Sequence, residues 1–247
     1  MCIRDRSKYI PMYGTTYRYL KSLKYFFDNR KWVKFDRLAI GSYASVLVAL
    51  LRIKQFTSIQ EIGGGFLSSK LFREYSEEKH IKHFVYESNT EWFNKLSEIN
   101  VGASNTTVHL VNKLSGNNNE TLLTSLGYDA SLIDAEQLVF IDDGQIAEER
   151  TRTINTILEK LKSITIIHDA QTPAYREALD RLELRDIGVI HYFDERLPST
   201  AVFVPKEVIA HNSNFFKDIK LEIAKLPKYF GSSEAEFFDF CRSQLFS

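Results

Sequence analysis

The chain has 247 residues, of which 44% are hydrophobic, 13% aromatic and 26% charged, a composition typical of a globular protein with a sizeable core. Lys and Arg balance Asp and Glu at 32 each, so no net field draws the protein to nucleic acid or to an anionic membrane. The longest mostly apolar run, Ala44 to Leu51, is far shorter than the roughly 20 residues that a membrane-spanning helix requires. These numbers exclude a histone-like or polybasic protein, and we expect a soluble one.

The first six residues, MCIRDR, resemble the translation of a sequencing adapter at the start of gene fragments assembled from environmental DNA. We therefore leave residues 1–6 out of the fold reasoning and expect the natural amino terminus to be missing. Cys241 is then the only cysteine, which excludes an internal disulfide or a cysteine metal site. A reducing, cytoplasmic setting is the expectation.

Residues 7–55 are predicted to form a basic, aromatic helical extension. Residues 7–54 hold ten Lys or Arg against two acids, and the spacing of Tyr13, Tyr17 and Leu20 fits one face of a helix. Such a composition also occurs on nucleic-acid-binding surfaces, where cations hold phosphates and rings stack on bases. The helical spacing favours packing on the main domain, with Ser42–Ile53 as the last helix of the segment and Ser42 as its cap.

Short β-type runs then alternate with helical stretches over residues 56–206. This alternation predicts an α/β fold, a doubly wound seven-stranded Rossmann-like sheet. The expected strands are Ser58–Ile62, His83–Tyr86, Thr107–Leu110, Leu138–Ile141, Ile164–Ile167, Gly188–His191 and Ala201–Val204. The expected helices are Leu67–Ser76, Thr90–Ile99, residues 120–126, Ala147–Leu161 and Pro173–Leu184, followed by a C-terminal helical tail over residues 207–247.

Right-handed crossovers bring the carboxyl ends of parallel strands to one edge, where ligands bind. At the first strand end, Glu61 is followed by Ile62 and then by Gly63, Gly64 and Gly65, a turn whose bare backbone can approach a ligand at a helix amino terminus. Glu87 ends the second strand, and an acid there can accept both hydroxyls of a ribose. Either motif alone also occurs as a plain tight turn or an exposed carboxylate.

Acids gather at the ends of the fourth and fifth strands. Asp142 and Asp143 end the fourth, and His168 and Asp169 end the fifth. Crowded carboxylates either share a proton or bind a hard cation such as Mg²⁺ or Ca²⁺. Without a metal, His168 or Asp169 is the expected general base, although a packed histidine is an equally good interpretation of His168.

Taken in order, these motifs resemble class I S-adenosylmethionine-dependent methyltransferases, in particular a branch whose fourth strand reads F-I-D-D-G-H and whose fifth ends in H-D. The resemblance runs from Tyr43 to Val204. It implies a seven-stranded sheet whose last strand is antiparallel, and S-adenosylmethionine lying over Gly63, Gly64 and Gly65 with Glu87 on its ribose. Glu61 and Asp142 complete the expected cofactor set, and the expected catalytic residues are Asp142, His168 and Asp169.

The resemblance also implies a metal ion. Asp142 and Asp169 match positions that hold the metal in catechol-type O-methyltransferases, where the ion lowers the pKa of a substrate hydroxyl. The chain departs from the pattern at several places. Ala170 stands where an Asn usually follows the second aspartate, Leu67 interrupts the turn before Ser68, and Gln145 replaces a histidine. A P-G-G turn before the fifth strand is also missing.

The leading hypothesis is therefore an S-adenosylmethionine-dependent methyltransferase that O-methylates a small molecule with a sugar or aromatic hydroxyl, assisted by Mg²⁺ or another divalent cation if the acids bind one. A small-molecule acceptor is the expected partner, with neither nucleic acid nor membrane. Two alternatives stay open. One is a nicotinamide-dependent oxidoreductase, disfavoured because the turn lacks a clean G-x-G-x-x-G; the other is a catalytically degenerate Rossmann-like module that binds a partner through its basic segment.

Overall fold

The structure is a computed structural model that describes residues 43–111, 137–143, 147–160, 163–184, 187–194, 198–227 and 234–247. The basic, aromatic segment before Tyr43, the helix expected at residues 120–126 and Gln145 lie outside the described residues.

Seven strands form one mixed sheet in the order β3-β2-β1-β4-β5-β7-β6. Their bounds are β1 Ser58–Ile62, β2 Lys82–Glu87, β3 Thr106–Leu110, β4 Gln137–Ile141, β5 Ile164–Ile167, β6 Gly188–Phe193 and β7 Thr200–Pro205. Strands β1 to β5 pair in parallel, whereas β7 lies antiparallel to both β5 and β6. The predicted α/β fold and its seven strands are confirmed, with bounds within two residues of those expected.

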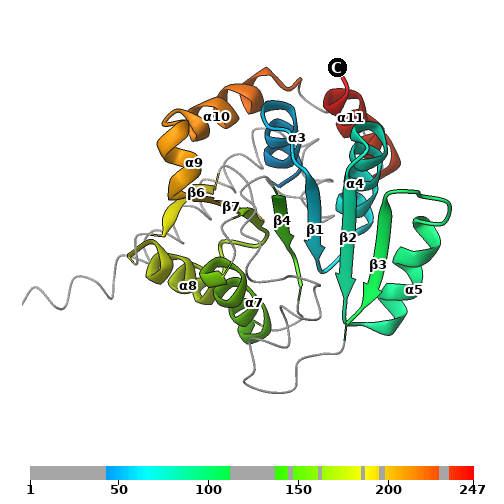
Figure 1. Ribbon diagram of the computed structural model, residues 1–247, viewed down its shortest axis with the longest axis horizontal. Helices are drawn as coiled ribbons and strands as arrows, with labels where there is room; N and C mark the ends of the chain where they lie inside the picture. Colours follow the sequence, from blue (N-terminus) through cyan, green and yellow to red (C-terminus); the bar gives the residue numbers. More distant parts are fainter. Residues whose placement is uncertain are drawn as a thin grey trace, which may run out of the picture.

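The helices that follow the strands cover both faces of the sheet, so the fold is doubly wound, as predicted (Figure 1). Their bounds are α3 Tyr43–Ile53, α4 Phe66–Lys79, α5 Thr90–Ile99, α7 Ala147–Lys160, α8 Pro173–Leu184, α9 Lys206–His211, α10 Phe215–Lys225 and α11 Glu234–Leu245. Helix α4 begins at Phe66, directly after the glycine turn, one residue earlier than predicted. None of the helices in the described ranges is long and apolar enough to cross a bilayer.

Two hydrophobic cores lie on opposite faces of the sheet. One contains α3 and α4, with Leu47, Leu71 and Phe140 among its fully buried side chains. The other lies under α7 and α8, with Ile154 and Leu179 at its centre. The central strand β1 is buried at all five positions because both of its faces are covered, as the near-continuous apolar pattern of the neighbouring strands indicates.

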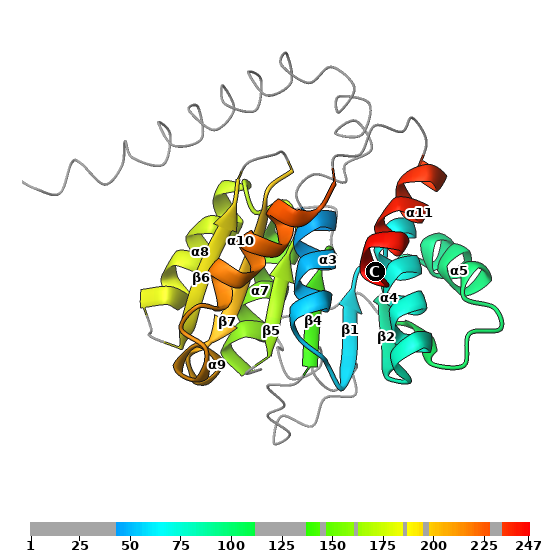
Figure 2. The ribbon, with the colours of Figure 1, turned by 90° about the horizontal axis from the view of Figure 1, so that it is seen from above.

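Helix α3 and the C-terminal helices share the first of these cores. Eight of the eleven residues of α3 are buried, and the helix packs between α10 and α11 (Figure 2). Phe215 of α10 and Phe237 of α11 are buried in the same cluster as Leu47. Helix α3 of the predicted extension over residues 7–55 and the helices α10 and α11 of the predicted tail over residues 207–247 thus pack together on one face of the sheet.

The ends of β1, β2 and β4 are joined by a tight turn at Gly63. Its amide donates to Tyr86 O (2.9 Å), and the amide of Asp142 donates to Ile62 O (2.8 Å). Gly63 has a φ of +79°, and a Cβ there would lie 2.5 Å from the backbone nitrogen of Asp143. Only glycine meets both conditions, since a positive φ strains other residues and the opposing atoms are backbone.

This contact predicts unequal effects of two matched substitutions. Gly102 also has a positive φ, of +82°, but a Cβ there would meet nothing within 4 Å. We expect Gly102→Ala to lower the free energy of unfolding by about 1–2 kcal/mol through backbone strain. Gly63→Ala should cost at least about 2 kcal/mol more, because the backbone of Asp143 must also move. Urea denaturation measures both, and equal losses would show that the close approach does not matter.

Candidate active site at the carboxyl edge of the sheet

A cavity of 510 Å³ opens where β1, β2 and β4 end. Its volume falls in the range of small-molecule sites. The described residues that line it are Gly63, Gly64, Glu87, Ser88, Asn89, Thr90, Glu91, Trp92, Asp142 and Asp143. Of the residues predicted from sequence, Gly63, Gly64, Glu87 and Asp142 therefore meet at one cavity. Glu61, Gly65, His168 and Asp169 are not among its described lining residues.

The glycine turn not only lines the cavity but also packs tightly against neighbouring side chains. A Cβ on Gly64 would lie 2.6 Å from the Leu96 side chain and 2.7 Å from that of Val85. Gly65 caps α4 without a side-chain hydrogen bond. The sequence analysis explained these glycines by the approach of a ligand, but the structure gives a second reason, since Gly64 must be bare for α5 and β2 to pack behind the turn.

Glu61 lies behind the turn and is fully buried. Its carboxylate accepts a hydrogen bond from the Ser69 hydroxyl (2.6 Å) and lies 3.2 Å from His83 Nε2 and 3.5 Å from the amide of Gly65. The other ring nitrogen of His83 lies 3.2 Å from the hydroxyl of Thr106. Glu61 therefore connects β1, β2 and α4, and it holds the turn from within the protein.

Glu87 is 8% exposed at the end of β2. Its Oε1 accepts hydrogen bonds from the amides of Ser88 and Asn89, both at 2.7 Å. Burial raises the pKa of Glu87, while the amides of Asn89, Ser88 and Gly64 act in the opposite direction. The two amides fix the plane of the carboxylate, which keeps further acceptor capacity for ligand hydroxyls.

Trp92 forms a wall of the cavity that sequence reasoning missed. Its indole N–H donates to the carbonyl oxygen of Gly64, and its ring makes an edge contact with Phe66 at a centroid distance of 4.7 Å. The side chain of Asn89 caps α5 by accepting from the amide of Trp92 (3.0 Å). An Asn followed by a helix pattern signals the cap. The contact with Gly64 depends on tertiary packing.

Asp142, His168 and Asp169, the three predicted catalytic residues, do lie together. His168 Nδ1 is 3.0 Å from Asp142 Oδ1 and 3.6 Å from Asp169 Oδ2. His168 is 4% exposed, and the edge of its ring contacts Tyr43. Burial lowers the pKa of His168, but the hydrogen bond and charge of Asp142 outweigh it, so the pKa is raised. A raised pKa favours the protonated imidazole, which cannot accept a proton.

Arg150, on the first turn of α7, is the residue that joins these acids. It is 5% exposed, and it forms ion pairs with Asp142 Oδ1 (2.9 Å) and Asp169 Oδ2 (3.1 Å). It also donates to the backbone oxygens of Asp143 (2.6 Å) and His168 (3.2 Å). The position of Arg150 in the sequence hints at such a role. A cation in the first turn of a helix is disfavoured by the helix dipole, which suggests that a specific acidic partner stabilises it.

The predicted metal ion does not fit this arrangement. Asp142, His168 and Asp169 each offer a ligand atom within 4.8 Å of the others. However, Asp142 Oδ1 already accepts from Arg150 and His168, and Asp169 Oδ2 pairs with Arg150. A divalent ion bound by these residues would compete with Arg150 for both carboxylates and would lie beside a buried guanidinium.

Asp143 lines the cavity next to Asp142. Its Oδ2 accepts a hydrogen bond from the Thr153 hydroxyl (2.6 Å). Burial raises the pKa of Asp143 to about 6, against the lowering effects of Thr153 and Arg150. A carboxyl with such a pKa changes protonation state near neutral pH, which suits proton transfer.

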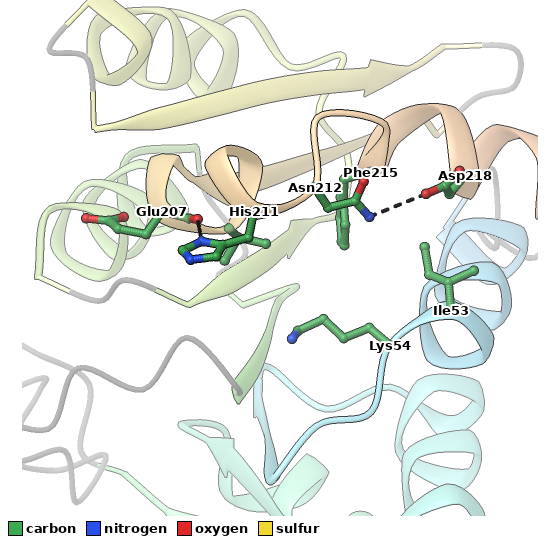
Figure 3. A pocket seen from close by; sticks show the side chains of 8 residues that line it. Ile53, Lys54, Glu207, His211, Asn212, Phe215 and Asp218 are labelled. Carbon is green, nitrogen blue, oxygen red and sulfur yellow. Dashed lines mark hydrogen bonds between the residues drawn. The ribbon is translucent and has the colours of Figure 1, made fainter.

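A second cavity, of 470 Å³, lies at the opposite end of the sheet. It lies between Lys54, just before β1, and helices α9 and α10, where Asn212 donates to Asp218 (3.4 Å) (Figure 3). None of the sequence-predicted site residues is among its described lining residues.

No protein-family profile matches the sequence, and no curated protein matches it. Several solved structures are similar at low identity. A precorrin-6y C5,15-methyltransferase from Geobacter metallireducens is 15% identical, over 65% of this chain and 84% of that one, with a TM-score of 0.44. The O-methyltransferase TomG from Streptomyces achromogenes, solved in complex with SAM, is 14% identical over 83% and 99%, with a TM-score of 0.45. A spermidine synthase from Thermotoga maritima is 12% identical over 81% and 70%, with a TM-score of 0.45.

The buried position of Glu61 leads to a prediction about stability. Glu61→Ala leaves His83 and Ser69 buried without their partner, so it should lower the free energy of unfolding by about 3–5 kcal/mol. Glu91→Ala is the matched control, because Glu91 pairs with Lys95 on the exposed surface of α5 and should contribute no measurable stability. Urea denaturation of both variants tests this, and similar midpoints would refute the holding role of Glu61.

Proposed function

We propose that this protein is an S-adenosylmethionine-dependent methyltransferase. One observation carries the proposal. Gly63 and Gly64 after β1, Glu87 at the end of β2 and Asp142 after β4 line a single cavity, on a sheet in which an antiparallel β7 lies between β5 and β6. That sheet is the one the sequence resemblance implied. A dinucleotide-binding Rossmann sheet has instead the order 3-2-1-4-5-6.

The cavity residues suit the parts of this cofactor. Glu87, buried and fixed by two amides, would accept the ribose hydroxyls. Gly63 and Gly64 offer bare backbone to the amino-acid part, near the amino terminus of α4, where unpaired N–H groups favour a carboxylate. When bound, the cofactor supplies an electrophilic methyl group, which passes to an acceptor nucleophile aligned with the carbon–sulfur bond. Holding the two reactants in line supplies much of such a rate.

We propose further that the acceptor is a small molecule with a sugar or aromatic hydroxyl. Asp142 and Asp143 are the carboxylates that β4 brings to the cavity, and a hydroxyl that attacks a methyl group must give up its proton. The raised pKa of Asp143, about 6, suits that transfer near neutral pH. Asp142 would orient the acceptor. His168 and Asp169 would influence the acceptor only indirectly, His168 through its hydrogen bond to Asp142 and Asp169 through its ion pair with Arg150.

Cofactor binding is the direct test. By calorimetry we expect S-adenosylmethionine to bind, and Glu87→Ala to weaken binding at least tenfold, about 1.4 kcal/mol. Glu91→Ala is the control, because Glu91 lines the same cavity but is exposed and paired with Lys95; its affinity should stay within about twofold. Tighter binding of NAD would favour the oxidoreductase. Binding of neither, with salt-sensitive RNA binding, would favour the non-catalytic module.

The pH dependence of binding follows from Glu87. Burial raises its pKa, so the carboxylate takes up a proton at a higher pH than an exposed Glu does. The ionised form is the stronger acceptor for ribose hydroxyls, so affinity should be full above this raised pKa and fall as the pH is lowered through it. Glu87→Gln cannot ionise at this position and should bind weakly, with a shallower profile from about pH 4 to 8 because only other groups, such as Asp143, still titrate there. A wild-type profile as shallow as that of Glu87→Gln would contradict the role.

A further inference from the structure

We infer that Arg150 is the resident cation of the acidic pair Asp142 and Asp169, and that it excludes divalent metal ions from this edge of the sheet. Arg150 is thus a positioning residue, which fixes Asp142 at the edge of the cavity. In catechol-type O-methyltransferases, which the sequence resembles, a metal ion occupies the corresponding place. The exclusion of metal stands independently of methyl transfer, whereas the positioning role rests on the proposed function.

The guanidinium of Arg150 uses all three of its nitrogens in this cluster. Nη2 pairs with Asp142 and Nη1 with Asp169, while Nε and Nη1 donate to the backbone oxygens of Asp143 and His168. One side chain from α7 therefore ties the end of β4 to the end of β5. A forked guanidinium suits this geometry, because it presents several donors in fixed directions to two carboxylates.

Two features show that the surroundings are built for this cation. The ring of Tyr175 lies 5.3 Å from the guanidinium carbon of Arg150, so an aromatic face covers it. Asp169 has a φ of +57°, a strained value for an aspartate, and in that conformation its carboxylate meets Arg150. Strain of this kind persists only where surrounding contacts maintain it, and the ion pair is such a contact.

A divalent ion and Arg150 would compete for the same atoms. Mg²⁺ binds carboxylate oxygens at about 2.1 Å in a strict octahedron. Asp142 Oδ1 and Asp169 Oδ2, one oxygen of each carboxylate, lie within 3.1 Å of an Arg150 nitrogen, so an ion between the two acids would sit beside the guanidinium. Because Arg150 is only 5% exposed, turning it away from the carboxylates would also break its buried contacts with the backbone oxygens of Asp143 and His168.

Mn²⁺ titration by calorimetry, without cofactor or acceptor, tests the inference in four proteins. The wild type and Asp169→Asn should give the same isotherm, because in the wild type Asp169 binds no Mn²⁺. Arg150→Gln, which leaves the carboxylates without their cation, should gain a site at least tenfold tighter than any in the wild type. Arg150→Gln combined with Asp169→Asn should lose it again.

Arg150→Lys separates charge from structure. It keeps a positive charge without the fork, so it should still exclude Mn²⁺, whereas a loss of fold alone would affect Lys and Gln alike. An Mn²⁺ site in the wild type that Asp169→Asn removes would overturn the inference, as would a folded Arg150→Gln that gains no site. If Arg150→Gln does not fold, the comparison of wild type with Asp169→Asn still decides. None of these results depends on S-adenosylmethionine binding, so the proposed function can fail separately.

Discussion

The carboxyl edge of the sheet depends on one close approach, between the turn after β1 and the backbone after β4. Gly63 permits it, because it takes a positive φ and has no side chain to meet Asp143. The hydrogen bonds from Gly63 to Tyr86 and from Asp142 to Ile62 then fix the ends of β1, β2 and β4 in one row. Because the strand ends are aligned in this way, Glu87 and Asp142 line the same cavity without contacting each other.

Two buried ionisable side chains support this edge from behind. Glu61 connects the glycine turn to α4 and to His83, and Arg150 connects the end of β4 to the end of β5. Each collects partners from several elements, which offset the cost of removing a charge from water. The residues that line the cavity are therefore held in place by others, Glu61 and Arg150, that are not among its described lining residues.

The fold follows from the sequence to a large extent, and the site to a smaller one. Buried strands and amphipathic helices leave period-2 and period-3.6 patterns, so β1, β5 and α8 could be located almost to the residue. Strand ends likewise predicted that the Gly63 turn and Glu87 would meet. The roles of Glu61 and Arg150 could not be derived this way, because each depends on which side chains approach from elements distant in the chain. The sequence shows that an acid lies at a strand end, but it does not show whether that acid faces a ligand or a buried partner.

The acidic cluster illustrates this limit. Carboxylates crowded at two strand ends are compatible with a shared proton, a metal ion or a general base, and the nearest cation decides among them. That cation is Arg150, which neutralises Asp142 and Asp169, while Asp142 in turn favours the protonated form of His168. Asp143 differs from both. Its carboxylate is held by the Thr153 hydroxyl rather than by Arg150, and burial leaves its pKa near 6. Under the proposed function, Asp143 is therefore the acid of these two strand ends that would transfer a proton near neutral pH, because its carboxylate carries no ion pair with Arg150.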